Sequence, residues 1–181
     1  HRTQRAVKSF FSIPQLNEFS LVNEIIKNCP QPSHLHLSNS MSVRYANFIG
    51  LHDEQKEITV FANRGTSGID GCTSTAVGHG LASNTPTILI TGDMAFFYDR
   101  NAFWHNYQLP NLRIVVLNNH GGAIFGMIDG PEQLPELDEY FITHQKLSAR
   151  NVAIEYDFDY LKLDSLKKLK NLLKDFFDFD G

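Results

Sequence analysis

Cysteine, tryptophan and long apolar runs are all scarce in this sequence of 181 residues. The two cysteines, Cys29 and Cys72, stand far apart, so neither a disulfide framework nor a cysteine-rich metal site is indicated. No apolar run approaches the roughly 20 residues that cross a membrane, and no secretory signal is visible. A net charge of −4 shows no basic excess, so nucleic acid is not an expected partner. These absences predict a cytoplasmic protein whose thiols are reduced and packed.

Length and composition predict one folded domain. A chain of 181 residues with 42% hydrophobic residues has enough material for a single core. Because it begins with His1 and not with methionine, we expect it to be a piece of a longer protein. Residues 1–32 are expected to form a linker with a first helix, and residues 33–181 the main domain.

A pattern of strand, helix and strand lies between Thr87 and Gly122. Two short apolar runs, at 87–91 and 113–117, flank a segment of helical length at 95–108. Both runs are continuously apolar, as strands buried on both faces of a parallel sheet are. The pattern therefore predicts an α/β fold of three layers, with a mostly parallel sheet between helices on both faces.

Polar residues follow both of these strands. Gly92 and Asp93 follow the first, and Asn118 and Asn119 follow the second, with 24 residues between Asp93 and Asn118. In a parallel sheet both pairs emerge at the carboxyl edge, where ligands bind in open α/β sheets. A carboxylate and an amide oxygen there can share a magnesium ion, and the N–H groups that open the next helix suit a phosphate.

Each polar pair taken alone is more simply explained as a turn, with Asp93 as a helix N-cap. The two pairs together, each preceded by a strand, favour a site for a metal ion and a diphosphate. Gly121 and Gly122 would allow a backbone carbonyl to turn toward such a metal.

The remaining elements are predicted from hydrophobic periodicity and helix caps. Further strands are predicted at 33–37, 59–62 and 160–163. Helices are predicted at 17–28, 72–82, 148–156 and from 165 onward. Ser38, Asn39 and Ser40 each suit an N-cap, and the helix that they would open is predicted to continue to residue 48. Residues 1–16 show no clear periodicity. Residues 129–140, acidic and with two prolines, are predicted to form a loop, solvated or acting as a mobile flap.

Further candidate binding residues follow the other strands. Ser40 and Arg44 lie four residues apart and so share a helix face. Arg64 leads into a glycine-rich loop at 63–71, where the backbone can approach a ligand closely. Hydroxyl and guanidinium groups together suit a carboxylate ligand. On pattern alone, a helix cap and a solvated arginine remain the simpler explanation of Ser40 and Arg44.

Histidine and aromatic residues are assigned mainly to packing. His34 and His36 share one strand face, and without a third ligand a structural role is favoured over a metal. His79 is expected to be packed or at the surface. The aromatic residues of 95–108 are too many for a solvated face, so they predict a core or a subunit interface.

These motifs together resemble a known family. Gly92-Asp93 and Asn118-Asn119 resemble the cofactor motif of the thiamine-diphosphate-dependent enzymes, with Met94 where that family more often has glycine. Three runs make the resemblance closer: 39–44 (NSMSVR), 63–71 (NRGTSGIDG) and 118–125 (NNHGGAIF). They resemble the C-terminal, diphosphate-binding domain of the 2-succinyl-5-enolpyruvyl-6-hydroxy-3-cyclohexene-1-carboxylate synthases of menaquinone biosynthesis. The run at 63–71 is the most specific, because thiamine enzymes of other branches lack it.

The resemblance implies a role for each matching residue. Asp93, Asn119 and the Gly121 carbonyl would hold Mg²⁺ or Mn²⁺. Thiamine diphosphate would lie against the other cofactor-binding residues, which are Ile69, Gly92, Met94, Ala95, Gly122 and Ile124, with Ile69 as the apolar buttress that bends the cofactor. Substrate carboxylates would bind Ser40, Arg44 and Arg64, and Ile124 and Phe125 would line the substrate pocket.

The resemblance also implies a reaction and an assembly. The full enzyme would decarboxylate 2-oxoglutarate and add the succinyl carbanion equivalent to isochorismate, as a homodimer or homotetramer. In this family a glutamate on an N-terminal domain of a neighbouring subunit activates the cofactor. No segment here resembles that domain, so no catalytic residue is assigned, Glu18, Glu54 and Glu57 included. We expect the isolated chain to be inactive and to lack the last strand of its sheet.

Two alternatives stay open. The chain could be the corresponding domain of another thiamine enzyme, such as a 2-oxoacid decarboxylase or acetolactate synthase, which should not need Ser40, Arg44 and Arg64 together. It could also be a non-catalytic α/β module that binds a nucleotide or a partner, although no Gly-x-Gly-x-x-Gly motif follows any predicted strand.

Overall fold

A parallel four-stranded sheet forms the centre of the computed structural model, which describes residues 2–179. Its strands are β1 (Ser33–Leu37), β2 (Ile58–Ala62), β3 (Thr87–Gly92) and β4 (Leu112–Leu117). They lie in the order β2-β1-β3-β4, and every neighbouring pair is parallel. The predicted parallel sheet is confirmed, and each of these four strands begins and ends within one residue of its predicted bounds.

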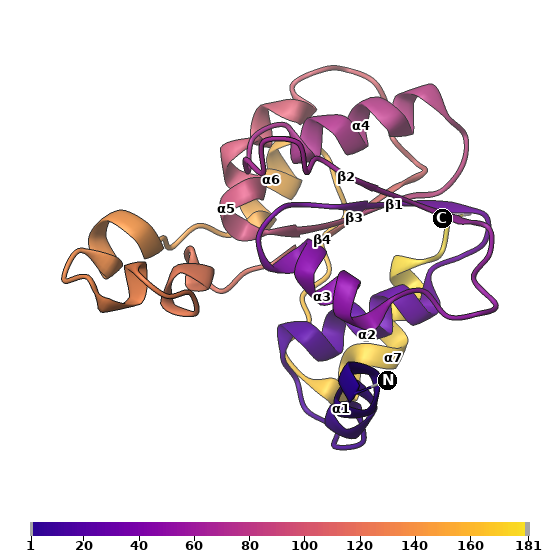
Figure 1. Ribbon diagram of the computed structural model, residues 1–181. Coiled ribbons are helices and arrows are strands. Elements are labelled where there is room, and N and C mark those ends of the chain that lie inside the picture. The colour runs from indigo at the N-terminus through magenta and orange to yellow at the C-terminus, as the bar shows by residue number, and fades with distance from the viewer. Residues whose placement is uncertain (1, 180–181) are drawn as a thin grey trace.

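Helices cover both faces of the sheet (Figure 1). One face carries α2 (Glu18–Asn28), α3 (Met41–Ile49) and α7 (Leu166–Phe176), and the other carries α4 (Cys72–Ala82), α5 (Asp93–Tyr98) and α6 (Ala149–Glu155). β3 divides the core, because Ile88 and Ile90 pack in the cluster of the first face and Leu89 in that of the second. All three side chains are 0% exposed. The predicted three-layer α/β architecture is confirmed.

The helix predicted at 95–108 is wrong in both bounds. α5 begins at Asp93 and ends at Tyr98, and a 3₁₀ helix, η1 (Arg100–Phe103), follows. Asp99 lies at the break, where its carboxylate accepts hydrogen bonds from the backbone N–H and the hydroxyl of Ser74, at 2.7 and 2.6 Å. Asp99 thus satisfies a free N–H in the first turn of α4, a contact that helix periodicity cannot reveal.

The aromatic residues of this segment divide between core and surface. Phe96 and Phe103 are buried in the second core cluster. Tyr98, Trp104 and Tyr107 are 69%, 78% and 70% exposed. The prediction that aromatic residues of this segment belong to the core is confirmed for Phe96 and Phe103.

Other predictions fail where tertiary contacts decide. Residues 160–163 form no strand within the part of the chain that the structure describes. The linker at 1–16 contains α1 (Arg2–Phe11), whose Phe11 ring lies 4.9 Å from that of Phe19. The helix predicted to follow a cap at 38–40 and to continue to 48 is α3, which begins at Met41 after Ser40, but the Ser40 side chain makes no cap hydrogen bond. The division of the chain at residue 33 stays a prediction.

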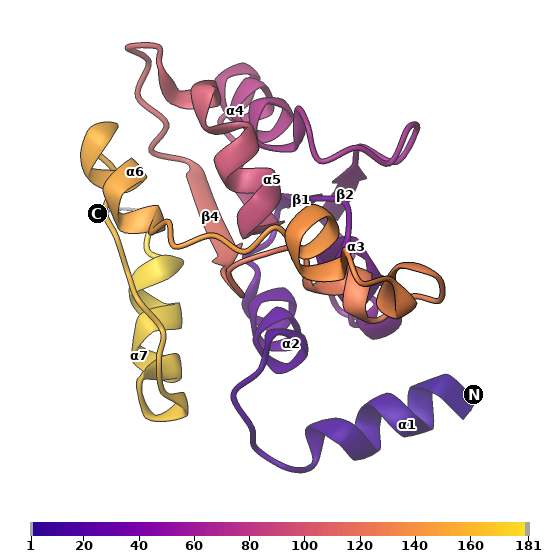
Figure 2. The ribbon, with the colours of Figure 1, turned by 90° about the vertical axis from the view of Figure 1, so that its left-hand side faces the viewer.

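The chain between β4 and α6 leaves the sheet as a lobe, residues 123–142 (Figures 1 and 2). The lobe contains three short helical turns, η2 (Ala123–Gly126), η3 (Pro131–Gln133) and a π-helix, η4 (Leu137–Ile142). The loop predicted at 129–140 is therefore partly helical. None of the helices in residues 2–179 combines the length and the apolar character that crossing a membrane requires.

Candidate functional site

The carboxyl ends of all four strands meet at one edge of the sheet. In the strand register Leu37 pairs with Ala62 and Ile90, and Gly92 pairs with Leu117. The segments that follow the strands are 38–40, 63–64, 93 and 118–119, so the polar residues predicted to share this edge do share it. The candidate site lies here, at the side from which the lobe projects (Figure 1).

Asp93 is the most deeply buried charged residue at this edge, with 2% exposure. Its Oδ1 accepts a hydrogen bond from the N–H of Met94 at 2.8 Å. Its Oδ2 accepts from the N–H of Gly121 at 2.9 Å and from Nε2 of Gln145 at 2.8 Å. These donors hold the carboxylate in one orientation. The Met94 N–H, predicted to face a phosphate, is thus already engaged.

Gln145, three residues after the end of the lobe, contacts the site through its side chain. Its Nε2 also donates to Oδ1 of Asn118 at 3.1 Å, and its backbone N–H donates to the carbonyl of His120 at 3.0 Å. The N–H of Gly122 donates to the carbonyl of Ile142 at 2.7 Å. A Cβ on Gly121 would lie 2.9 Å from that carbonyl oxygen, so this turn requires glycine. No pattern in the sequence marks Gln145, which lies 52 residues from Asp93.

Asn119, the other predicted metal ligand, is exposed and turns its amide nitrogen toward α2. Its Nδ2 donates to Oε1 of Glu18 at 2.8 Å, and the hydroxyl of Tyr45 donates to Oε2 of Glu18 at 3.1 Å. Burial, the charge of Glu18 and this hydrogen bond together raise the pKa of Tyr45 to about 12. Glu18 therefore belongs to this edge, although no role for it follows from the sequence alone.

Three oxygen groups at this edge are of the kind that suits a hard divalent cation. The edge offers the buried Asp93 carboxylate, the Oδ1 of Asn119 and the backbone at Gly121. Within residues 2–179, no group of three His, Cys, Asp or Glu side chains is placed to hold a metal. A cation here would thus need ligands from outside the chain, such as water or phosphate oxygens, which magnesium commonly keeps. The residues present fit a magnesium ion that carries a diphosphate.

Asn39 lies at the adjoining part of the edge, where its side chain contacts Arg64, one of the predicted substrate-binding residues. It is 2% exposed, and its Nδ2 donates to the carbonyls of Asn63, at 2.6 Å, and Gly68. Its Oδ1 accepts from Nη1 of Arg64 at 3.0 Å.

Ser40 and Arg44 lie directly beside Asn39. Nη1 of Arg44 donates to the carbonyl of Ser40 at 2.8 Å, and Ser40 itself has a φ of 74°. Arg44 is thus bonded to Ser40, and Arg64 to the adjacent residue Asn39. From the sequence alone Asn39 is only a possible helix cap. The signal that could have marked it is an amide two residues after a buried strand.

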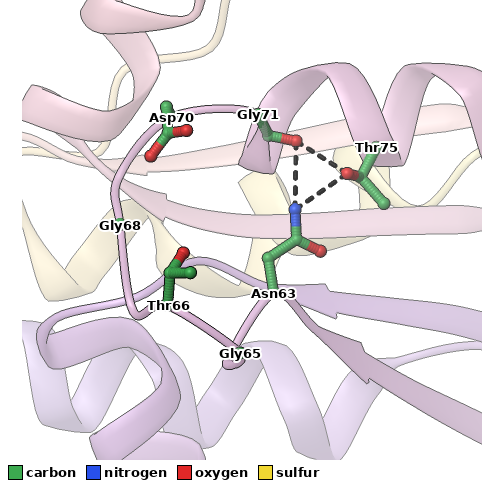
Figure 3. A pocket seen from close by; sticks show the side chains of 7 residues that line it. All are labelled: Asn63, Gly65, Thr66, Gly68, Asp70, Gly71 and Thr75. Atoms are coloured by element: carbon green, nitrogen blue, oxygen red, sulfur yellow. Dashed lines mark hydrogen bonds between the residues drawn. The ribbon is translucent and has the colours of Figure 1, made fainter.

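The glycine-rich loop encloses a cavity of about 390 Å³ (Figure 3). Asn63 closes its base, where its Nδ2 donates to Oγ1 of Thr75 at 2.8 Å and to the carbonyl of Gly71 at 3.2 Å. The other lining residues are Gly65, Thr66, Gly68 and Asp70. Ile69, the predicted buttress, is half-buried in this loop.

Ile124 and Phe125 lie in η2, within the lobe. Both are half-buried, and the Phe125 ring lies 5.6 Å from the ring of Phe141. No hydrogen bond or ring contact within residues 2–179 joins them to the arginines of the edge. Their predicted place in a substrate pocket stays a prediction.

Three histidines, His34, His36 and His79, form a packed cluster on the face of the sheet that carries α4. Nε2 of His36 lies 2.9 Å from Nδ1 of His79, and the rings of His34 and His79 stack 4.1 Å apart. Burial, followed by the neighbouring His79 and His34, lowers the pKa of His36 to about 4. The interpretation as packing residues is confirmed.

Comparison with known proteins relates this chain to one family. The family model described as "Thiamine pyrophosphate enzyme, C-terminal TPP binding domain" matches residues 40–181. Among solved structures, a benzoylformate decarboxylase from Polynucleobacter necessarius superposes with a TM-score of 0.70 over 94% of this chain and 32% of that one. At 19% identity, this second likeness concerns the fold alone.

Several curated relatives bear the name 2-succinyl-5-enolpyruvyl-6-hydroxy-3-cyclohexene-1-carboxylate synthase. The protein from Cytophaga hutchinsonii is 56% identical over 161 residues, which cover 89% of this chain and 28% of the relative. The protein from Flavobacterium psychrophilum is 43% identical over 173 residues, which cover 96% of this chain and 31% of the relative. The chain therefore spans less than a third of the length of these relatives.

Proposed function

This chain belongs to the family of thiamine pyrophosphate enzymes and corresponds to their C-terminal TPP-binding domain, and on that premise we propose that it binds thiamine diphosphate through a magnesium ion at Asp93. The observation that carries the proposal is the buried carboxylate of Asp93, oriented by backbone and amide donors at the carboxyl edge of a parallel sheet. Asn119 and the Gly121 carbonyl would complete the protein's share of the metal ligands, with Mn²⁺ as a substitute ion.

The other residues would position the cofactor. Gly92, Met94, Ala95 and Gly122 would lie against the diphosphate, and Ile69 and Ile124 against its rings. When bound, thiamine diphosphate supplies a carbanion at its thiazolium ring and takes up the electrons released by decarboxylation. The part of this chain is to hold the diphosphate and the metal, and to keep the Asp93 carboxylate oriented for them.

We further propose that the complete protein acts on 2-oxoglutarate and transfers the four-carbon unit left by its decarboxylation to isochorismate, in menaquinone biosynthesis. The relatives at 56% and 43% identity bear the name of a synthase for the resulting product. Both substrates carry several carboxylates, and at the same edge Arg44 bonds to the carbonyl of Ser40 and Arg64 to the neighbouring Asn39. Guanidinium groups bind carboxylates in two-point contacts, so two arginines give this edge a reason to select polyanions. Ser40 and Phe125 would complete the substrate side.

The assembly is part of the proposal. We place the activating glutamate on a separate domain of a neighbouring subunit, so that the working enzyme is a homodimer or homotetramer of the cytoplasm. The chain alone would then bind its cofactor weakly and show no turnover.

The first test is calorimetric titration of thiamine diphosphate into the complete protein that contains this chain, with and without Mg²⁺. The wild type should bind only with Mg²⁺, and Asp93→Ala should weaken binding by at least about 100-fold, because loss of a direct ligand should exceed the cost of losing an outer partner. Asp53→Ala, at an exposed aspartate, is the matched control. Binding that ignores Mg²⁺ or survives Asp93→Ala would contradict the proposal.

A second measurement separates the substrate proposal from other thiamine enzymes. Steady-state decarboxylation should favour 2-oxoglutarate over pyruvate, and Arg44→Ala or Arg64→Ala should raise KM for 2-oxoglutarate. A preference for pyruvate that neither variant changes would assign the chain to a 2-oxoacid decarboxylase or acetolactate synthase instead.

A further inference from the structure

We propose that Glu18 is a positioning residue for the metal site, because it fixes which end of the Asn119 side-chain amide is available to a cation. The inference rests on the proposed function, since it concerns the metal that Asp93 and Asn119 would share. It concerns a residue 101 positions away from Asn119 in the sequence, on a helix that follows no strand of the sheet.

Glu18 is held at this place from several directions. It is the first residue of α2, whose N-cap Asn17 accepts a hydrogen bond from the N–H of Ser20 at 2.9 Å. One carboxylate oxygen accepts from Tyr45 on α3 at 3.1 Å, and the other accepts from Asn119 at 2.8 Å. The ring of Phe19, the next residue, lies 5.4 Å from the ring of Tyr45. Glu18 is therefore a fixed acceptor and not a side chain free to follow Asn119.

The polarity of the contact decides the orientation of the amide. The two ends of an asparagine side chain have nearly the same shape, but one only donates hydrogen bonds and the other only accepts them. A carboxylate accepts, so Glu18 selects the nitrogen end and leaves Oδ1 turned away from it. A divalent cation binds the oxygen end only.

Nothing else at the edge fixes this choice. Asn119 is exposed, and among the hydrogen bonds of residues 2–179 its side chain takes part only in the one with Glu18. Without Glu18, both orientations of the amide would be open, and one of them turns the nitrogen toward the metal. Partners that orient a metal ligand typically change metal affinity by about 10- to 100-fold when they are removed.

The carboxylate of Glu18 could also attract a cation simply by its charge, and a substitution by glutamine separates the two roles. Glutamine removes the charge but keeps an oxygen that can accept from Asn119. A positioning role therefore predicts that Glu18→Gln retains most of the affinity that Glu18→Ala loses.

The experiment measures Mn²⁺ binding to the complete protein with saturating thiamine diphosphate, by the loss of the free-ion signal in electron paramagnetic resonance. Glu18→Ala should weaken Mn²⁺ binding by about 10-fold or more, and Glu18→Gln should stay within about threefold of the wild type, since its oxygen still accepts. Glu24→Ala is the matched control, because Glu24 lies on the same helix and accepts from its neighbour Asn23 at 3.2 Å. In an Asn119→Ala background, Glu18→Ala should cause no further loss.

Each outcome decides the proposal. Unchanged binding by Glu18→Ala overturns it, and so does an equal loss in Glu18→Ala and Glu18→Gln, which would indicate a charge effect. Additive losses in the double variant also overturn it. A wild type that binds no Mn²⁺ removes the proposed function itself. If Glu18→Ala does not fold, Tyr45→Phe takes its place: it keeps the ring and frees one side of Glu18, so a loss of affinity supports the proposal and unchanged affinity overturns it.

Discussion

Asn39 and Asp93 share a feature at the scale of single residues. Both are 2% exposed, and both use their side chains to tie together backbone segments that are distant in the sequence. A buried polar group is stable only when its hydrogen bonds are made, and its loss leaves its partners unsatisfied. The candidate site is therefore built from side chains that also hold the edge of the sheet together.

Asn39→Ala should lower the free energy of unfolding by about 2 to 4 kcal/mol, because it leaves the carbonyls of Asn63 and Gly68 without a donor. Chemical denaturation measures the change, and hydrogen exchange should show lower protection in residues 63–68. Asn39→Asp should share this loss while it keeps an acceptor for Arg64.

Asn47→Ala is the control for this prediction, because Asn47 is exposed on α3. It should change stability by no more than about 0.5 kcal/mol. Equal stabilities of the Asn39→Ala and Asn47→Ala proteins would show that the buried amide does not hold the loop.

At this scale the sequence predicts Asp93, Arg44 and Arg64 but not the residues that orient them. Asp93 and Arg64 each stand two residues after an apolar run, so their place at the edge follows from the strand pattern. Gln145 and Glu18 stand in ordinary surroundings, 52 and 101 positions from the residues they contact. Only the folded chain brings such partners together, and no local pattern marks them.

At the scale of elements, the sequence predicts the strands better than the segments between them. The strands are short, continuous apolar runs. Strands that are apolar on both sides need cover on both faces, which a parallel sheet between two layers of helices provides. The helix expected at 95–108 fails because Asp99 bonds to α4, and α1 is missed because its apolar side meets Phe19 across a turn. In both cases a contact between elements outweighs the local preference.

The lobe is an element whose attachment can be tested. Gln145→Ala removes the side-chain bonds to Asp93 and Asn118 and should weaken the base of the lobe by about 1 to 2 kcal/mol. Hydrogen exchange at the Gly121 and Gly122 amides should then speed up by roughly 10-fold. Limited proteolysis should cut residues 123–142 sooner.

Lys146→Ala is the matched substitution for this test, since Lys146 is the exposed neighbour of Gln145. It should leave exchange and proteolysis at the level of the wild type. If Gln145→Ala behaves in the same way, the backbone bonds alone hold the base of the lobe.

At the scale of the whole molecule, the packed histidines predict how stability depends on pH. The pKa of His36 is lowered from 6.5 to about 4, by burial first and then by His79 and His34. Burial and then His79 lower the pKa of His34 as well. As the pH falls below 6.5, the unfolded chain takes up a proton at His36 before the folded protein does. Stability should therefore be constant above pH 6.5 with respect to His36, and should fall between pH 6.5 and about 4.

Thermal unfolding at intervals from pH 7 to pH 4 measures this dependence. His36→Gln should show a smaller fall in Tm over the window than the wild type, because glutamine does not titrate. His52→Gln, at an exposed histidine, should follow the wild type. The same pH dependence in all three proteins would exclude His36 as the source.

The backbone bonds at the base of the lobe also bear on how proteins of this kind diverge. Gln145 to His120 and Gly122 to Ile142 fix both ends of the excursion, so the number of residues between them is free to change. Doubling a flexible loop adds only about 0.6 kcal/mol to the entropy of closing it. Insertions, deletions or an exchanged segment within 126–136 would thus leave Asp93 and its partners in place. Evolution can vary what this excursion presents to a substrate while the cation-binding edge stays the same.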